Sequence, residues 1–258
     1  MLLSQSIALF LPIFLCWGSF LGCLGYRLVH GIELTGRSHC PHCLHTIKWY
    51  DLFPVISWVW LGGSCRSCKY PISPLYPFIE LLTALTFMLL IYLVPTPYIP
   101  GYILLFSALI ITIRSDLETM LIPRAATLLL IPFGLVFSAC GLLPITFIEA
   151  IIGMLLGTAI LFGIAKLFSF FYKQDCLGQG DIELIALIGA FTGPYGVWAT
   201  LLIGSTVGSC IGIMYLLWSG NSRNTPLPFG PFLALGAMLY VLFNDAIIDL
   251  ILPYQLFN

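Results

Sequence analysis

Charged residues are scarce in this sequence of 258 residues. They make up 8% of the chain, against 60% hydrophobic residues, whereas a soluble domain carries about a quarter charged residues. Such a chain cannot cover a globular surface with polar groups, and it is too hydrophobic for intrinsic disorder. Ten Lys and Arg against eleven Asp and Glu give a formal net charge of −1, so no basic surface for nucleic acid is indicated. The composition indicates a membrane protein with several spans.

Histidine is also rare, and none occurs after position 45. The chain beyond that point therefore has no histidine base for a Ser–His or Cys–His nucleophile. The metalloprotease motif HExxH and a glycine-rich dinucleotide fingerprint are missing as well. The spacing HxxHxxH, which is typical of metal ligands, occurs at His39, His42 and His45. We interpret them as exposed loop residues, with a substituted zinc ligand as the alternative.

Long apolar runs predict an all-α, polytopic membrane helix bundle. A bilayer core of about 30 Å requires about 20 apolar residues per helix, and Gly193-Pro194 divides one run into two helices. Because no Lys or Arg precedes Arg27, the first run is expected to be a span rather than a cleaved signal. The sequence predicts about eight transmembrane helices, at 5–28, 76–94, 100–114, 124–143, 145–172, 182–193, 196–218 and 230–252.

These spans place all ten Lys and Arg on connections at one side of the membrane. The positive-inside rule makes that side cytoplasmic. The expected organisation is a first transmembrane helix at 1–28, a small cytoplasmic domain at 29–75 and a membrane helix bundle at 76–258.

Four of the nine cysteines form two CxxC pairs. Each pair can supply two thiolates to one tetrahedral ion. A loop of this size buries too small a hydrophobic core to be stable without a cross-link such as a bound metal. In a reducing cytoplasm a disulfide is disfavoured. We predict a structural zinc site, with a redox pair or a vestigial site as the alternatives; its ligands are Cys40, Cys43, Cys65 and Cys68.

Two aspartates are expected at the cytoplasmic rim of the membrane bundle. Asp116 closes the predicted helix 100–114, and Asp181 follows Gly178-Gln179-Gly180. Ionisable groups near a membrane span are functional candidates, and two adjacent carboxyls can act as general base and acid. Glycines permit backbone conformations closed to other residues and allow a substrate to approach closely. The alternative is a helix start with Asp181 as its N-cap.

A second acidic pair, Asp245 and Asp249, shares one helical face. It lies toward the outer end of the last predicted span, and we interpret it as interfacial.

The sequence resembles the type IV prepilin peptidases over nearly its whole length. The resemblance rests on the segments GSFL with YRL (18–28), SHCPHC (38–43), IKWYDLFPVISWVWLGGSCRSC (47–68), PISPLYPFIE (71–80), SDLETMLIP (115–123), GQGDIELIALIGAFTG (178–193) and PLPFGPFLALGA (226–237).

The resemblance implies a bifunctional GxGD-type aspartic peptidase and N-methyltransferase of the bacterial cytoplasmic membrane. Asp116 and Asp181 would be catalytic, with Gly178 and Gly180 in the active-site motif. The substrates would be prepilins or pseudopilins of type IV pili or type II secretion, whose short basic leader is removed at the cytoplasmic face after a glycine. S-adenosylmethionine would methylate the new N-terminal residue, typically Phe. The four cysteines would bind zinc; no residue is assigned to the methyl donor.

Three residues depart from the family pattern. Arg124 stands where Asp or Asn is usual, Glu183 where Lys is usual, and Gly25 replaces an apolar residue. We expect both aspartates to retain their role.

A basic leader would be attracted by acids on the same face, for which Glu118, Asp175 and Glu183 are the candidates. An ion- or proton-coupled transporter using the same acids and a noncatalytic assembly scaffold are the alternative functions.

Overall fold

The computed structural model describes residues 2–172, 177–219, 227–244 and 246–247. Within these ranges the regular structure is helical, apart from two isolated β-bridges, so the predicted all-α class is confirmed. The elements, in chain order, are α1 (Leu2–His30), η1 (Trp49–Asp51), α2 (Ile56–Trp60), α3 (Leu75–Leu93), η2 (Thr96–Tyr98), α4 (Ile99–Thr119), α5 (Arg124–Thr127), α6 (Ile131–Ala139), α7 (Phe147–Tyr172), α8 (Gln179–Ser219) and α9 (Gly230–Leu242).

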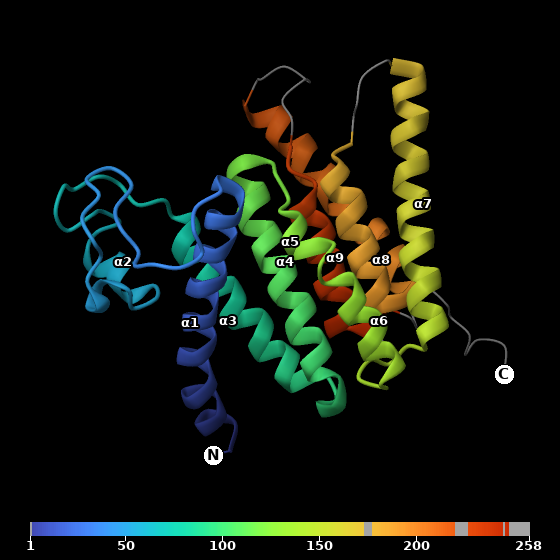
Figure 1. Ribbon diagram of the computed structural model, residues 1–258, viewed down its shortest axis with the longest axis horizontal. Helices are drawn as coiled ribbons and strands as arrows, with labels where there is room; N and C mark the ends of the chain where they lie inside the picture. Colours follow the sequence, from blue (N-terminus) through green and yellow to red (C-terminus); the bar gives the residue numbers. More distant parts are fainter. Residues whose placement is uncertain (1, 173–176, 220–226, 245, 248–258) are drawn as a thin grey trace. The chain divides into compact units, whose positions relative to one another are not determined.

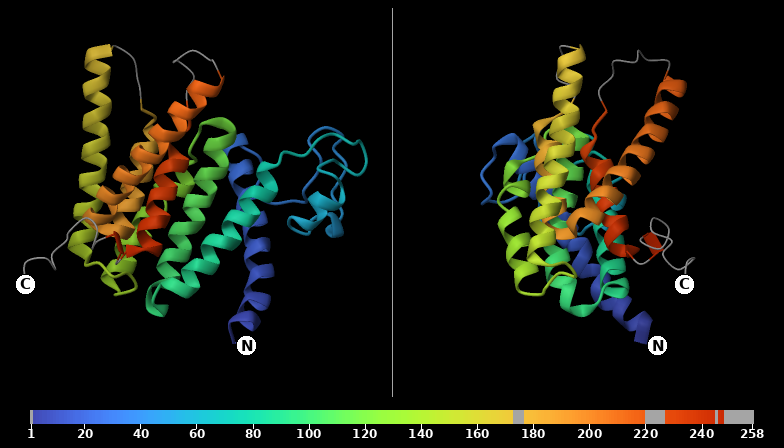
Figure 2. Two further views of the ribbon diagram at one scale, coloured as in Figure 1. Left: turned by 180° about the vertical axis from the view of Figure 1, so that it is seen from behind. Right: turned by 90° about the vertical axis from the view of Figure 1, so that its right-hand side faces the viewer.

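The chain divides into two compact units, Met1–Leu89 and Leu90–Asn258. The first contains α1, most of α3 and the loop between them, which carries η1 and α2 (Figure 1). In the second, α8 packs against both α7 and α9, and α9 also packs against α4 (Figures 1 and 2).

In the part of the chain that the structure describes, five helices are long and apolar enough to cross a membrane: Leu9–His30, Leu75–Leu93, Thr96–Thr119, Phe147–Phe171 and Gln179–Trp218. The last of these bends at Gly193, whose φ of 69° and ψ of −172° are not helical. If the helix Gln179–Trp218 is counted as two spans that meet at this bend, the number of long apolar helices is six. The shorter apolar helices Arg124–Ala139 and Gly230–Leu242 bring the number in the described residues to the predicted eight.

Two predicted boundaries are wrong. The helix expected to end at 114 continues to Thr119, because Arg114 pairs with Glu118 one turn later at 2.5 Å and such a pair supports a helical turn. The helix expected over 124–143 is broken into α5 and α6. Pro132 lies in the first turn of α6, where its missing N–H is tolerated, whereas it cannot continue a helix that arrives from α5. The end of the predicted helix 230–252 lies outside the described residues.

Glycines let α7 and α8 approach closely. A Cβ atom on Gly153 of α7 would lie 2.6 Å from the carbonyl oxygen of Gly189 in α8 and equally close to the carbonyl carbon of Gly193. Gly153 and Gly157 form one GxxxG pair, and Gly189 and Gly193 form another. In a membrane, where lipid is as apolar as a leucine side chain, such close backbone contact favours helix association. This packing holds the first half of α8 in place.

The helix that carries Asp116 is buried on every side. Each residue of α4 from Leu105 to Asp116 is buried, and a helix that is apolar all round belongs inside a bundle. The end of α4 therefore presents its polar residues to the interior of the second unit.

Candidate active site and metal centre

Asp116 lies in the last turn of α4 and is 4% exposed. The backbone N–H of Gly230, the first residue of α9, donates to its Oδ2 at 3.0 Å. The helix ends at Met120, whose left-handed φ of 56° turns the chain away while its N–H donates to the carbonyl of Asp116. Asp116 is thus held from both its backbone and its carboxylate.

Asp181 lies in the first turn of α8 and is 9% exposed. Its N–H donates to the carbonyl of Gly178 at 3.2 Å, which ties it to the glycine motif. Ile122 lies close to Gly180, the residue before Asp181, and to Gly230, whose N–H binds Asp116. Residues that neighbour the two acids, which are far apart in the sequence, therefore lie close together in the fold.

The two glycines before Asp181 do not have the unusual backbone conformation expected of them. Neither has a positive φ. What requires them is space: a Cβ on Gly178 would lie 3.2 Å from Oδ2 of Asp181, and one on Gly180 would lie 2.9 Å from Cβ of Ile122. Close packing accounts for the lack of a side chain at these two positions.

Ile122 lies between the two halves of this site. Its side chain meets the Cα positions of both Gly180 and Gly230, since a Cβ on Gly230 would lie 3.1 Å from its Cδ1. The residue therefore contacts the start of α8 and the start of α9 at once. Sequence reasoning missed it and Gly230, although both lie within segments that carry the family resemblance.

The two charge departures from the family pattern contact each other. Nε of Arg124 lies 3.2 Å from Oε1 of Glu183. The hydroxyl of Thr127 donates to Oε2 of the same carboxylate at 3.4 Å. Both oxygens of Glu183, a residue only 9% exposed, are thus bound, and α5 is tied to α8.

These contacts alter the expected attraction of a basic leader. Glu183 is paired with Arg124 and Glu118 with Arg114, so neither offers an unpaired negative charge. The third candidate, Asp175, lies outside the described residues, as do Asp245 and Asp249 of the second acidic pair.

The four cysteines of the two CxxC pairs come together in the first unit. Their sulfur atoms all lie within 4.8 Å of one another, and the Sγ atoms of Cys40 and Cys68 are 3.8 Å apart. A tetrahedral zinc ion with Zn–S bonds of about 2.3 Å requires sulfurs about 3.8 Å apart. The cluster therefore fits zinc. Within the described residues this metal-ligand group consists of cysteines alone. The three nearby histidines, His39, His42 and His45, are exposed.

Charge explains why such a cluster needs a cation. Backbone N–H groups of Cys68 and Ser67 lower the pKa of the Cys65 thiol to about 7. The N–H of Tyr70 lowers that of Cys68, but burial and the neighbouring thiols outweigh it and raise the pKa to about 12. One thiolate forms readily and further ones are opposed, so a divalent cation is what stabilises several thiolates together.

The two CxxC segments have the same local structure, a repeat that the sequence does not reveal. Each is closed by an isolated bridge, His39 with Thr46 and Ser64 with Pro71. In each, the residue after the second cysteine has positive φ, 58° at Leu44 and 59° at Lys69. These matching turns bring each pair of sulfurs to one side.

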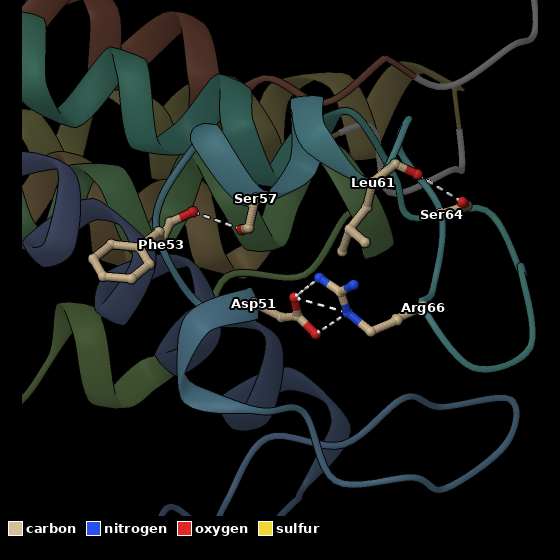
Figure 3. Close-up of polar contacts among 6 residues, drawn as sticks. All are labelled: Asp51, Phe53, Ser57, Leu61, Ser64 and Arg66. Atoms are coloured by element: carbon tan, nitrogen blue, oxygen red, sulfur yellow. Dashed lines mark hydrogen bonds and ion pairs between the residues drawn. The ribbon is translucent and has the colours of Figure 1, made fainter.

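The rest of the loop braces these turns. Arg66 donates from two nitrogens to Asp51, with Nε 2.9 Å from Oδ2 and Nη2 2.6 Å from Oδ1 (Figure 3). At the other end of the loop the Glu80 carboxylate in α3 accepts the N–H of Val55 at 2.7 Å. The metal cluster is therefore connected by polar contacts to the helix that follows it.

Comparison with known proteins agrees with this architecture. Residues 13–94 match the model of the bacterial peptidase A24 N-terminal domain, and residues 103–213 match that of the type IV leader peptidase family. A prepilin leader peptidase/N-methyltransferase from Aeromonas hydrophila is 37% identical over 82% of this chain and 73% of its own length. One from Pseudomonas aeruginosa is 32% identical over 82% and 73%.

A third relative is the type 4 prepilin-like proteins leader peptide-processing enzyme of Escherichia coli strain H10407. It is 34% identical over 78% of this chain and 74% of its own length. No solved structure matches the chain.

Proposed function

The chain belongs to the type IV leader peptidase family, and on this basis we propose that it removes the leader peptide of type IV prepilins or pseudopilins, with Asp116 and Asp181 as its catalytic pair. The observation that carries the proposal is the packing around Asp116: its carboxylate accepts a hydrogen bond from Gly230, and Ile122 lies against both Gly230 and Gly180, the residue before Asp181. Two buried carboxyls brought together in this way suit acid–base hydrolysis of an amide.

In this mechanism one carboxyl group is ionised and its partner carries a proton. The ionised group takes a proton from a water molecule, whose oxygen attacks the scissile carbonyl carbon, while the protonated group donates a hydrogen bond to the carbonyl oxygen. When the C–N bond breaks, the proton passes to the leaving nitrogen. Water is the nucleophile, which agrees with the lack of histidine beyond position 45.

The names of the relatives support a second activity. We propose that the chain N-methylates the new N-terminal residue with S-adenosylmethionine. The cleaved leader would be short and basic, and the new first residue typically Phe.

The zinc loop and the aspartate pair are proposed to lie on the cytoplasmic side of the bacterial inner membrane, because the predicted spans place all ten Lys and Arg on connections of one side. The four cysteines would hold one zinc ion. A bound ion would link both turns of the loop, and because four sulfur ligands would leave no open position for catalysis, its role would be structural.

Cleavage of a prepilin by purified enzyme in detergent tests the peptidase. We expect Asp116→Asn and Asp181→Asn each to reduce cleavage by at least about a thousand-fold. Glu149→Gln is the matched control, because this carboxylate accepts bonds from Thr146 at the start of α7 and glutamine preserves such a capping box. Cleavage by either Asn variant at the wild-type rate contradicts the mechanism.

Two further readouts separate the activities and the alternatives. Methyl transfer to a pre-cleaved pilin should persist in both Asn variants. Turnover in detergent, where no ion gradient exists, would oppose the transporter, and the transporter alternative has no support from the family match.

A further inference from the structure

Glu183 and Asp181 leave the first turns of α8 in opposite directions. They are two residues apart, and each residue of an α-helix turns the direction by about 100°. Asp181 lies against Gly178, whereas Glu183 binds Arg124 and Thr127 of α5. The same short piece of helix is therefore held on one face by α5 and presents the candidate catalytic group on the other.

The contact on the α5 face joins a buried carboxylate to one buried and one exposed donor. Glu183 is 9% exposed and Thr127 is fully buried, while the Arg124 side chain is 66% exposed. A buried carboxylate without partners is strongly destabilising. Here the hydroxyl and the guanidinium each bind a different oxygen, so the position of Glu183 is defined by two donors.

This contact also affects the position of Ile122. Arg124 follows Pro123 directly, and Ile122 packs against Gly180 and Gly230 on the other side of that proline. Gly230 in turn donates to Asp116. A shift of α5 along α8 would move Ile122, and with it both glycines beside the two aspartates.

We propose that Arg124, Glu183 and Thr127 form a brace that positions Asp181 against Asp116, in which Arg124 and Glu183 act as one exchangeable pair of opposite charges. The inference rests on the proposed peptidase function. Arg124 and Glu183 are positioning residues, because they act through the helix and do not touch the reacting atoms.

Three variants test the exchange, and two others control for the change in charge. Arg124→Glu opposes two carboxylates, and Glu183→Lys opposes two cations; we expect each to lower kcat at least about ten-fold with little change in KM. The double variant restores attraction with the signs reversed, and its kcat should return to within about three-fold of wild type. Arg37→Glu and Glu33→Lys, at exposed loop positions, make the same charge changes and should leave kcat unaltered.

The outcomes separate the brace from other roles. If Glu183 attracted the basic leader instead, Glu183→Lys would raise KM, most strongly at low salt, and the double variant would not recover. That result overturns the proposal, as does a wild-type kcat in either single reversal. If the reversals fail to accumulate in the membrane, Arg124→Gln and Glu183→Gln replace them, and the double variant must be more active than Arg124→Gln alone, which leaves the buried carboxylate of Glu183 without its charged partner.

Failure of the brace and failure of the peptidase function are distinguishable. Wild type and Asp181→Asn are measured on the same prepilin, and their difference tests the function alone. In the Asp181→Asn background, melting temperature repeats the Arg124 and Glu183 cycle without any need for cleavage. Additive losses in that cycle refute the pairing even if the enzyme proves not to be a peptidase.

Discussion

Replacing Gly230 by alanine adds one methyl group beside Asp116. The substitution therefore tests the packing and the hydrogen bond that hold this carboxylate. The new Cβ would lie 2.8 Å from Oδ2 of Asp116 and 3.1 Å from Cδ1 of Ile122. Ordinary contacts between such atoms begin near 3.4 Å, so the carboxylate must retreat by about half an ångström and lengthen its bond to the N–H of residue 230. A hydrogen bond to a charged group contributes about 1.5–3 kcal/mol, and each 1.4 kcal/mol is a factor of ten in rate.

We therefore expect Gly230→Ala to lower kcat for prepilin cleavage roughly 10- to 100-fold. The fold should survive, because the substitution is at the first residue of a helix and alanine favours helix. Gly163→Ala in α7 is the matched control, since a Cβ there meets nothing within 4 Å.

The measurement is steady-state cleavage of a prepilin by purified variants, with the melting temperature recorded in parallel. A Gly230→Ala enzyme with wild-type kcat would show that Asp116 does not depend on this hydrogen bond during turnover. A loss of activity matched by Gly163→Ala would point to a general effect of glycine replacement and equally refute the reasoning.

Three further predictions concern stability. Gly153→Ala should destabilise the protein by about 1–3 kcal/mol because its Cβ meets the backbone of α8 at 2.6 Å, whereas Gly163→Ala should not; equal melting temperatures would contradict the close α7–α8 contact. Cys68→Ser should reduce bound zinc, about one per chain in the wild type, to near zero under a chelator and expose the loop to proteolysis. The pKa of Asp51 is lowered chiefly by its hydrogen bond from Arg66, so this pair stabilises the fold above the unfolded pKa of about 3.9 and loses that effect as pH falls through the folded pKa. Asp51→Asn should therefore lower stability to denaturant at pH 7 by no more than about 1 kcal/mol, and the difference from wild type should shrink below about pH 4; a difference that grows there would refute the assignment.

Features encoded locally were predictable from the sequence. The CxxC pairs are local, because two cysteines three residues apart need only one turn to face the same ion. The bend of α8 was predictable for the same reason, since Gly193-Pro194 acts on its own backbone. The helical class followed from the length of the apolar runs.

Contacts between distant segments were not predictable in this way. The hydrogen bond from Gly230 to Asp116 joins residues 114 positions apart. The sequence around either residue does not predict this contact. Arg124 and Glu183 were each noticed as a charge departure, but only the packing of α5 on α8 reveals that they neutralise each other.

The misplaced end of α4 has a related cause. Arg114, Asp116 and Glu118 look like the polar boundary of a membrane span, so the helix was expected to stop there. In the fold Arg114 is fully buried and pairs with Glu118, and this allows the helix to carry Asp116 into the interior. A charged side chain marks a boundary only when it lacks a partner within reach.

Three glycines around the candidate catalytic pair show what the GxGD pattern encodes physically. Gly178 and Gly180 lie at the start of α8 and Gly230 at the start of α9, and none of the three has a positive φ. At Gly178 and Gly230 the forbidden Cβ would approach a carboxylate oxygen, at 3.2 and 2.8 Å, and at Gly180 it would approach Ile122 at 2.9 Å. Their shared property is therefore lack of volume. A side chain at any of these three positions would intrude on Asp116, Asp181 or Ile122, so the lack of volume around the two aspartates is as much a property of the candidate site as the carboxyls are.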